Sequence, residues 1–148
     1  MGVPKLNLKV VTPERVLHEG EIDQATLPTA MGQITVLPHH IPLVSNLVPG
    51  EIVIKHGQEE IFIVCDGGFV EVTPGGLVVL ADAGQRADEV DEQIVEEAIK
   101  RAEQALAQAG TADPNYAVLR GKLDREMSRL RVARRYKQRG ATRTGQSQ

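Results

Sequence analysis

The spacing of apolar residues changes once along this chain, near residue 87, and this change limits the folds open to it. Before that point apolar and polar residues alternate, as in Lys5–Val11, which is typical of strands with one buried face. After it apolar residues recur every three or four positions, which is typical of amphipathic helices. We therefore expect an α+β chain with a β domain over residues 1–86 and a helical domain over residues 87–139.

Short strand-like segments separated by Gly and Pro fill residues 1–86. Pro49-Gly50 and Gly67-Gly68 are among the expected turns. Many short strands in close succession favour a sandwich or a barrel, and no long helical stretch interrupts them. The expected strands are Lys5–Val11, Ile22–Leu27, Gln33–Leu37, Glu51–His56, Glu60–Cys65, Phe69–Thr73 and Leu77–Ala81.

Residues 87–139 predict two helices joined by a short loop, which is typical of an antiparallel hairpin. Gly110 is the expected C-terminal stop of the first helix, and Asp113-Pro114 the expected start of the second. We expect residues 140–148 to form a flexible tail. The expected apolar faces are Val90, Ile94, Ala98, Ala102, Ala105 and Ala109 on the first helix, and Tyr116, Leu119, Leu123, Met127, Leu130 and Ala133 on the second.

The first helix offers mostly alanine to its partner, so the hairpin is expected to be only marginally stable. Each buried methyl or methylene group contributes only about 0.8 kcal/mol. Helices that meet through small residues approach closely but bury little apolar area. The sequence therefore predicts a mobile element rather than a rigid part of the core.

Charge is distributed unevenly along the chain. The formal net charge is −3, but residues 1–115 hold 7 Lys and Arg against 18 Asp and Glu, whereas residues 116–148 hold 10 against 2. Such a basic end predicts an acidic partner, which could be a protein, a nucleotide, a nucleic acid or a membrane. Aromatic residues make up only 3% of the chain, so an aromatic platform for bases is not expected.

Nothing in the sequence predicts catalysis or metal binding. His39-His40 has no third ligand at metal spacing, because His18 and His56 belong to other segments. No glycine-rich phosphate loop precedes a Lys-Ser or Lys-Thr pair. Cys65 lies in an apolar run, which indicates a small core residue. We expect no enzyme, no metal and no required cofactor, and because no apolar run is long enough to span a bilayer, contact with a membrane only through partners.

The segment Gly32–Lys55, GQITVLPHHIPLVSNLVPGEIVIK, resembles the family of epsilon subunits of bacterial and chloroplast F-type ATP synthases. Its Leu37-Pro38, His40, Pro42-Leu43 and Pro49-Gly50 follow the family pattern. Further similar segments are VVTP near the N-terminus, GGFVEV at 67–72 and ADAGQRADEVD at 81–91, so that the resemblance covers about residues 5–138 in one register.

The resemblance implies a ten-stranded antiparallel β-sandwich followed by a two-helix hairpin. It implies a non-catalytic rotor subunit in the central stalk of a proton-translocating synthase, which couples the catalytic head to the membrane ring of c subunits. Its implied partners are the gamma subunit, the c ring and, when the helices extend, the beta and alpha subunits of the head. The extended helices would inhibit ATP hydrolysis, and nucleic acid is not an implied partner.

The resemblance also implies a location and a set of contact residues. The protein would be peripheral, on the cytoplasmic face of a bacterial inner membrane, or on the stromal face of the thylakoid (CF(1)) if the chain is plastid-encoded. Gln33, His39 and His40 would lie in loops that face the c ring. Arg120, Lys122, Arg131, Arg134 and Arg135 would contact the acidic lever of the beta subunit.

Some members of the family bind ATP through an Asp-x-x-Arg-Ala motif and two arginines of the last helix. Asp91, Arg125 and Arg129 match this pattern, but Ile94 stands where the motif has Arg. Because an apolar side chain replaces a guanidinium there, we expect ATP at most as a weak regulatory ligand.

One alternative from a different class remains at this stage. A free-standing β-sandwich adaptor could use the same basic hairpin to bind nucleic acid or an acidic protein. Binding to nucleic acid with a steep salt dependence would identify this alternative.

Overall fold

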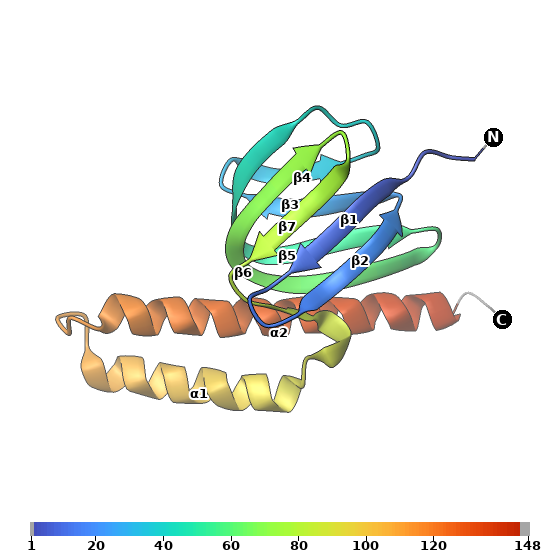
Figure 1. Cartoon of the computed structure of the whole chain (residues 1–148). Coiled ribbons are helices and arrows are strands. Elements are labelled where there is room, and N and C mark those ends of the chain that lie inside the picture. The colour runs from blue at the N-terminus through green and yellow to red at the C-terminus, as the bar shows by residue number, and fades with distance from the viewer. Residues whose placement is uncertain (1, 146–148) are drawn as a thin grey trace. The chain divides into compact units, whose positions relative to one another are not determined.

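The computed structural model describes the backbone of residues 2–145 and the side chains of residues 2–140. The chain divides into two compact units, Met1–Arg86 and Ala87–Gln148. This division falls where the spacing of apolar residues changes. Figure 1 shows that strands make up the first unit and helices the second, and each unit is described by itself.

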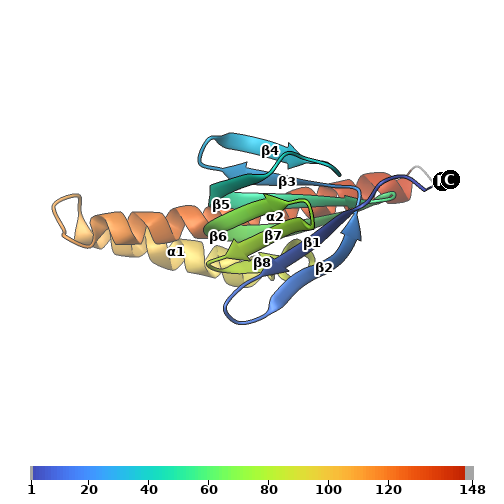
Figure 2. The same cartoon turned by 45° about the horizontal axis from the view of Figure 1, so that its top comes forward.

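Eight strands form the first unit. They follow one hydrogen-bonded path in the order β2-β1-β7-β6-β5-β3-β4, and β8 pairs with β6. In Figures 1 and 2, β3 and β4 face β1, β2 and β7 in the two layers of a sandwich. The strands are β1 (Leu6–Val11), β2 (Val16–Ile22), β3 (Gln24–Thr29), β4 (Gly32–Val36), β5 (Leu43–His56), β6 (Glu59–Thr73), β7 (Gly76–Ala81) and β8 (Gly84–Arg86).

The expected sandwich is confirmed, but it has eight strands rather than ten, because β5 and β6 are unusually long. They pair in one register from Leu43 opposite Val72 to His56 opposite Glu59. Pro49-Gly50 and Gly67-Gly68, expected as turns, therefore lie inside strands. Gly67 and Gly68 have φ angles of 105° and 127°, which glycine adopts at little cost, so β6 continues through a bend.

The sheet is also not wholly antiparallel, because β1 and β7 pair in parallel from Leu8 opposite Leu77 to Val11 opposite Leu80. Parallel neighbours need a long crossover connection, and here the intervening strands of the domain supply it. Strand β2 was not expected from the sequence, since most of its side chains are exposed and do not alternate cleanly.

A single apolar cluster fills the sandwich and draws on strands β1 to β7. Aliphatic side chains dominate it, and Leu8, Leu27, Ile54 and Val79 are almost fully buried. The thiol of Cys65 is buried as well, and burial raises the pKa of Cys65, as expected for a core residue rather than a nucleophile. All members of the cluster lie within the first unit, so this domain has a core of its own.

The second unit contains a short 3-10 turn, Ala87–Glu89, and the expected helical hairpin, made of α1 (Glu92–Ala109) and α2 (Tyr116–Gly145). The Asp91 side chain accepts hydrogen bonds from the backbone N–H groups of Gln93 at 3.0 Å and Ile94 at 3.3 Å, so it caps α1. Gly110, with φ of 74°, ends the helix as expected.

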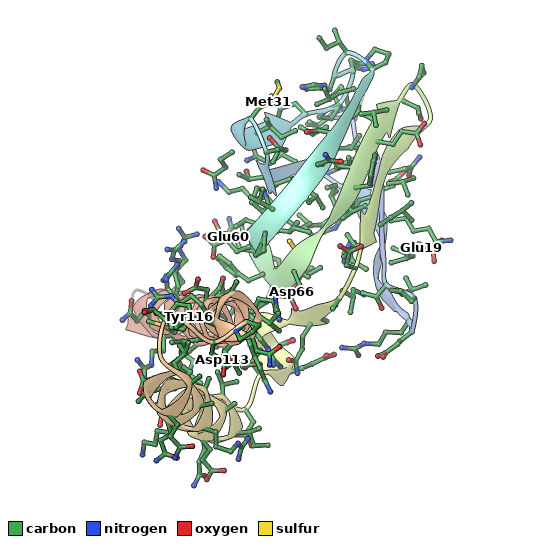
Figure 3. The ribbon with its side chains drawn as sticks, turned by 90° about the vertical axis from the view of Figure 1, so that its left-hand side faces the viewer. Glu19, Met31, Glu60, Asp66, Asp113 and Tyr116 are labelled. Carbon is green, nitrogen blue, oxygen red and sulfur yellow. The ribbon has the colours of Figure 1, made fainter. Side chains whose placement is uncertain are left out.

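Both ends of α2 differ from the expectation. The Asp113 carboxylate accepts from the Asn115 N–H at 2.7 Å, so Asp113-Pro114 forms a turn and the helix begins at Tyr116 (Figure 3 labels Asp113 and Tyr116). At the other end, residues 140–145 are helical instead of forming a tail, because extending an existing helix costs little per residue. Residues 146–148 of the expected tail lie outside the described residues.

The apolar stripe of α1 is narrower than expected. Val95 and Ala102 are buried, whereas Ile94 is 61% exposed. On α2, Leu123 and Ala133 are buried as expected, but Met127 is 43% exposed. Between residues 2 and 145, no helix is long and apolar enough to cross a membrane.

Candidate functional site

Gln33 lies near the start of β4, whereas His39 and His40 lie beyond its end. Gln33 is the second residue of the strand and pairs with Pro28 of β3. His39 and His40 follow the strand, and together with Lys5, Asn7 and Thr73 they line a surface cavity of about 330 Å³. Gln33 does not line this cavity, so the strand separates it from the two histidines.

The loop that carries the histidines is held by hydrogen bonds between residues close in sequence. The His40 N–H donates to the Leu37 carbonyl at 3.1 Å, and His40 Nδ1 lies 2.7 Å from the Ile41 carbonyl, which only a protonated Nδ1 can satisfy. His39 has φ of 64°, an uncommon angle for a residue other than glycine. The exposed side chain of His39 is therefore presented by a loop of defined shape.

A cluster around His18 was missed by sequence reasoning, which placed His18 and His56 on separate segments. His18 Nε2 is buried and has no hydrogen-bond partner among the described residues. Burial, the positive charge of Arg86 and the nearby His56 lower the pKa of His18 below its ordinary value of 6.5, while Glu59 acts in the opposite direction. Among the described side chains, those of residues 2–140, no three metal-ligating groups come together.

Acidification is expected to destabilise the protein partly through His18. Since the folded chain disfavours the charged imidazole, the unfolded chain binds the proton more readily. The stability contributed by neutral His18 is complete above pH 6.5 and is lost as the pH falls from 6.5 through the lowered folded pKa. Melting temperatures measured between about pH 7.5 and about pH 5 should show a smaller decrease for His18→Gln than for the parent chain. His39→Gln, an exposed control, should retain the parental slope, and equal slopes for all three proteins would contradict this assignment.

An exposed apolar row crosses the outer face of β5, β6 and β7. Phe69 pairs with Leu80, and Val78 lies opposite Glu71, which in turn faces Val44. We call Val44, Phe69, Val78 and Leu80 the outer apolar row; their exposures are 62%, 51%, 36% and 55%. Exposed apolar side chains that gather on one face, here with Glu71 between Val44 and Val78, mark interaction surfaces. The alternation of β6 and β7 could have indicated the row, but not that one side of the sheet stays uncovered.

The basic helix α2 finds some of its acidic partners within the hairpin. Arg120 pairs with Asp124 at 3.4 Å, and Arg129 donates to both carboxylate oxygens of Glu126 at 3.1 and 3.2 Å. Arg134 Nη2 donates to Glu96 of α1 at 2.6 Å. Acidic residues of the chain itself therefore meet several of these cations, and the expected contact with an acidic partner stays a prediction.

Three of the five arginines and lysines expected to contact the beta subunit share one groove. Arg131, Arg134 and Arg135 line it together with the apolar side chains of Ile99, Met127 and Leu130, and its volume is about 480 Å³. Arg120 and Lys122 lie outside this groove. A groove lined by both apolar and cationic side chains suits an acidic amphipathic partner.

Two of the three residues that match the ATP motif are engaged within the hairpin. Asp91 caps α1, and Arg129 is engaged by Glu126. The exposed Ile94 brings no charge. Among the described residues, Arg125 neither caps a helix nor forms an ion pair of this kind.

Comparison with known proteins identifies close relatives. The model of the family described as "ATP synthase, Delta/Epsilon chain, beta-sandwich domain" matches residues 5–87. The ATP synthase epsilon chain of Dehalococcoides mccartyi is 43% identical over 129 residues, which are 87% of this chain and 92% of the relative. The epsilon chain of Chloroflexus aggregans is 41% identical, with coverages of 89% and 94%, and that of Halalkalibacterium halodurans is 35% identical, with coverages of 90% and 100%.

A solved structure supports the fold independently. A chain in the cryo-EM structure of the Euglena gracilis mitochondrial ATP synthase, OSCP/F1/c-ring, superimposes with a TM-score of 0.67. The match covers 85% of this chain and 79% of that chain at 21% sequence identity. At this identity the similarity speaks for the fold alone.

Proposed function

Because the chain belongs to the ATP synthase epsilon-chain family, we propose that it is the central-stalk subunit of a proton-translocating F-type ATP synthase and restrains ATP hydrolysis through its helical hairpin. It acts without catalytic residues of its own, as an accessory subunit. The observation that carries this proposal is the division at Arg86: a sandwich with its own core is followed by a hairpin that buries mainly small side chains. In this proposal the sandwich serves the coupling and the hairpin changes position.

In this proposal the sandwich binds the gamma subunit through the outer apolar row and the c ring through Gln33, His39 and His40. The groove of the hairpin, with Arg131, Arg134 and Arg135, receives an acidic segment of the beta subunit. The protein is then peripheral, on the membrane face that carries the catalytic head, which is the cytoplasmic face in a bacterium. The alternative of a free-standing adaptor gains no support from the relatives, which are themselves named ATP synthase epsilon chain.

Phe69→Asp is expected to weaken the binding of gamma at least tenfold, since burying a Phe side chain contributes about 1.5–3 kcal/mol and a buried carboxylate costs more. Phe69 is half exposed, so the sandwich should still fold. Titration of purified gamma with the intact chain measures the affinity, and circular dichroism checks the fold. Met31→Asp is the control, because Met31 is 87% exposed at the turn between β3 and β4 and lies outside the outer apolar row (Figure 3). Unchanged affinity of Phe69→Asp for gamma would exclude the row as the gamma contact.

ATP is expected to stabilise the isolated chain little or not at all. Asp91 and Arg129 already serve the hairpin itself, and Ile94 supplies no cation. Ligand binding raises stability by mass action. ATP at one hundred times its Kd would contribute about 2.7 kcal/mol. Thermal unfolding with and without millimolar MgATP measures the effect. A rise in melting temperature of many degrees would contradict the expectation, and Ile94→Arg tests whether the missing guanidinium is the cause.

A further inference from the structure

Four charged side chains connect α1 and α2 at the end of the hairpin away from its loop. Arg134 donates to Glu96 at 2.6 Å and lies 3.9 Å from Glu92, whose other oxygen lies 3.0 Å from Lys137 Nζ. Glu92 and Glu96 are one turn apart on α1, and Arg134 and Lys137 are one turn apart on α2. Two carboxylates therefore face two cations across the helix interface.

Glu92 is the least exposed member of this network, since the side chains of Glu96, Arg134 and Lys137 are 46%, 53% and 67% exposed. The Glu92 side chain is 24% exposed, and its Oε1 is buried without a hydrogen bond of good geometry among the described residues, so that Lys137 is its partner by charge. Leaving a buried carboxylate oxygen without a cation is costly. Loss of the Lys137 charge while the helices stay packed would therefore cost free energy at Glu92.

The position of the network matters because the other end of the hairpin is closed by the chain itself. Residues 110–115 join the helices there, so separation must begin at the end that carries Glu92 and Lys137. Few of the described side chains of the two helices are buried, namely Val95, Ala102, Leu123, Val132 and Ala133. In a hairpin with so small an apolar interface, a few ion pairs are a substantial part of what keeps the helices together.

Arg134 also lines the groove that the proposed function assigns to an acidic partner. Its guanidinium cannot remain paired with Glu96 and at the same time give its full charge to a carboxylate of that partner. Closure of the hairpin and binding of an acidic partner thus compete for one side chain. Two states that compete for the same group are coupled, and the coupling acts in both directions.

We propose that Glu92, Glu96, Arg134 and Lys137 form an ionic latch that holds the hairpin closed and releases Arg134 when it opens. The latch itself follows from the geometry of the hairpin, while its regulatory effect rests on the proposed function. Because exposed ion pairs are screened by salt, the latch also makes closure sensitive to ionic strength.

Pulsed electron paramagnetic resonance on the intact chain tests the latch directly. Spin labels replace Gln93 and Gln138, which flank the latch residues in sequence, in a Cys65→Ala background. The double variant Glu92→Gln with Glu96→Gln should increase the fraction of molecules with separated helices roughly fivefold. The matched control is Asp124→Asn with Glu126→Gln, which removes the same charge but only from pairs within α2, and it should leave the distances unchanged.

Two further arms separate charge pairing from other effects of the substitutions. Glu96→Arg alone should open the hairpin, and the charge exchange Glu96→Arg with Arg134→Glu should close it again. A merely structural role of Glu96 would not produce this recovery. Raising NaCl from about 0.05 M to about 0.5 M should open the parent chain but not the latch-free variant further. Equal interhelical distances in the parent and the latch-free variant would overturn the latch.

The same variants distinguish a failed latch from a failed function. If the latch-free chain opens in isolation but the assembled ATP synthase hydrolyses ATP at the parental rate, the latch stands and the regulatory role of the hairpin is wrong. If the distances do not change, the latch is wrong whatever the rate of hydrolysis. Agreement of both measurements, opening together with altered hydrolysis, supports the two proposals jointly.

Discussion

A chain from which residues 88–148 have been deleted is expected to fold, to assemble with gamma and to raise ATP hydrolysis by the enzyme about fivefold, the effect of removing a restraint of about 1 kcal/mol. The sandwich should fold without the helices because its apolar cluster lies entirely within residues 1–86. The outer apolar row also remains, so the proposed gamma contact is retained.

Three measurements check this result: the thermal unfolding of the truncated chain, its copurification with gamma, and the steady-state rate of ATP hydrolysis by the reconstituted enzyme. A deletion of residues 141–148 alone is the control, because it preserves Glu92, Glu96, Arg134 and Lys137 and should leave the rate unchanged. If the truncated chain assembles while hydrolysis stays as low as with the full chain, the hairpin does not regulate this motor.

Gly68→Ala is expected to destabilise the sandwich by about 3 kcal/mol or more. Gly68 has φ of 127°, and a methyl group there would lie 2.9 Å from the Cα of Ala81 and closer still to the carbonyl oxygen of Leu80. Both obstacles belong to the backbone of β7 and cannot rotate away. The strain of the backbone angle and the steric overlap therefore add.

Thermal unfolding of the full chain measures this effect, and for a domain of this size the melting temperature should fall by more than about 12 °C. Gly20→Ala is the matched control: Gly20 also has a positive φ, 148°, but open space surrounds the position of the missing Cβ. It should lose only about 1 kcal/mol through backbone strain. Similar melting temperatures for the two variants would show that β6 and β7 can separate at Gly68 at little cost.

Much of the fold could be predicted from the sequence because each unit has its own spacing of apolar residues. The strand bounds predicted wrongly are those of β5 and β6, in which local turn signals conflict with strand pairing. Pro49-Gly50 and Gly67-Gly68 indicated turns, but their long strands β5 and β6 stabilise each other along the whole register. Local propensity yields there to pairing with a neighbour that is distant in sequence.

The interaction surfaces were predicted less completely, for a physical reason that residue types alone do not reveal. The cations of α2 were evident, but Glu96 lies 38 positions before Arg134, and only the antiparallel packing of the helices brings them together. Likewise, His18 and His56 influence each other only because β2 and β5 belong to one sandwich. The charge of each side chain could be predicted from the sequence. Which charged side chains meet across two elements could be seen only in the folded structure.

Cleavage of the chain between its two units, inside the assembled enzyme, tests the central claim most directly. A protease site inserted between Arg86 and Ala87 allows the rate of ATP hydrolysis to be measured on one preparation before cleavage and after removal of the released helices. We expect hydrolysis to rise while the sandwich remains bound to the enzyme. An unchanged rate after complete cleavage and release would contradict the claim that the hairpin restrains the motor.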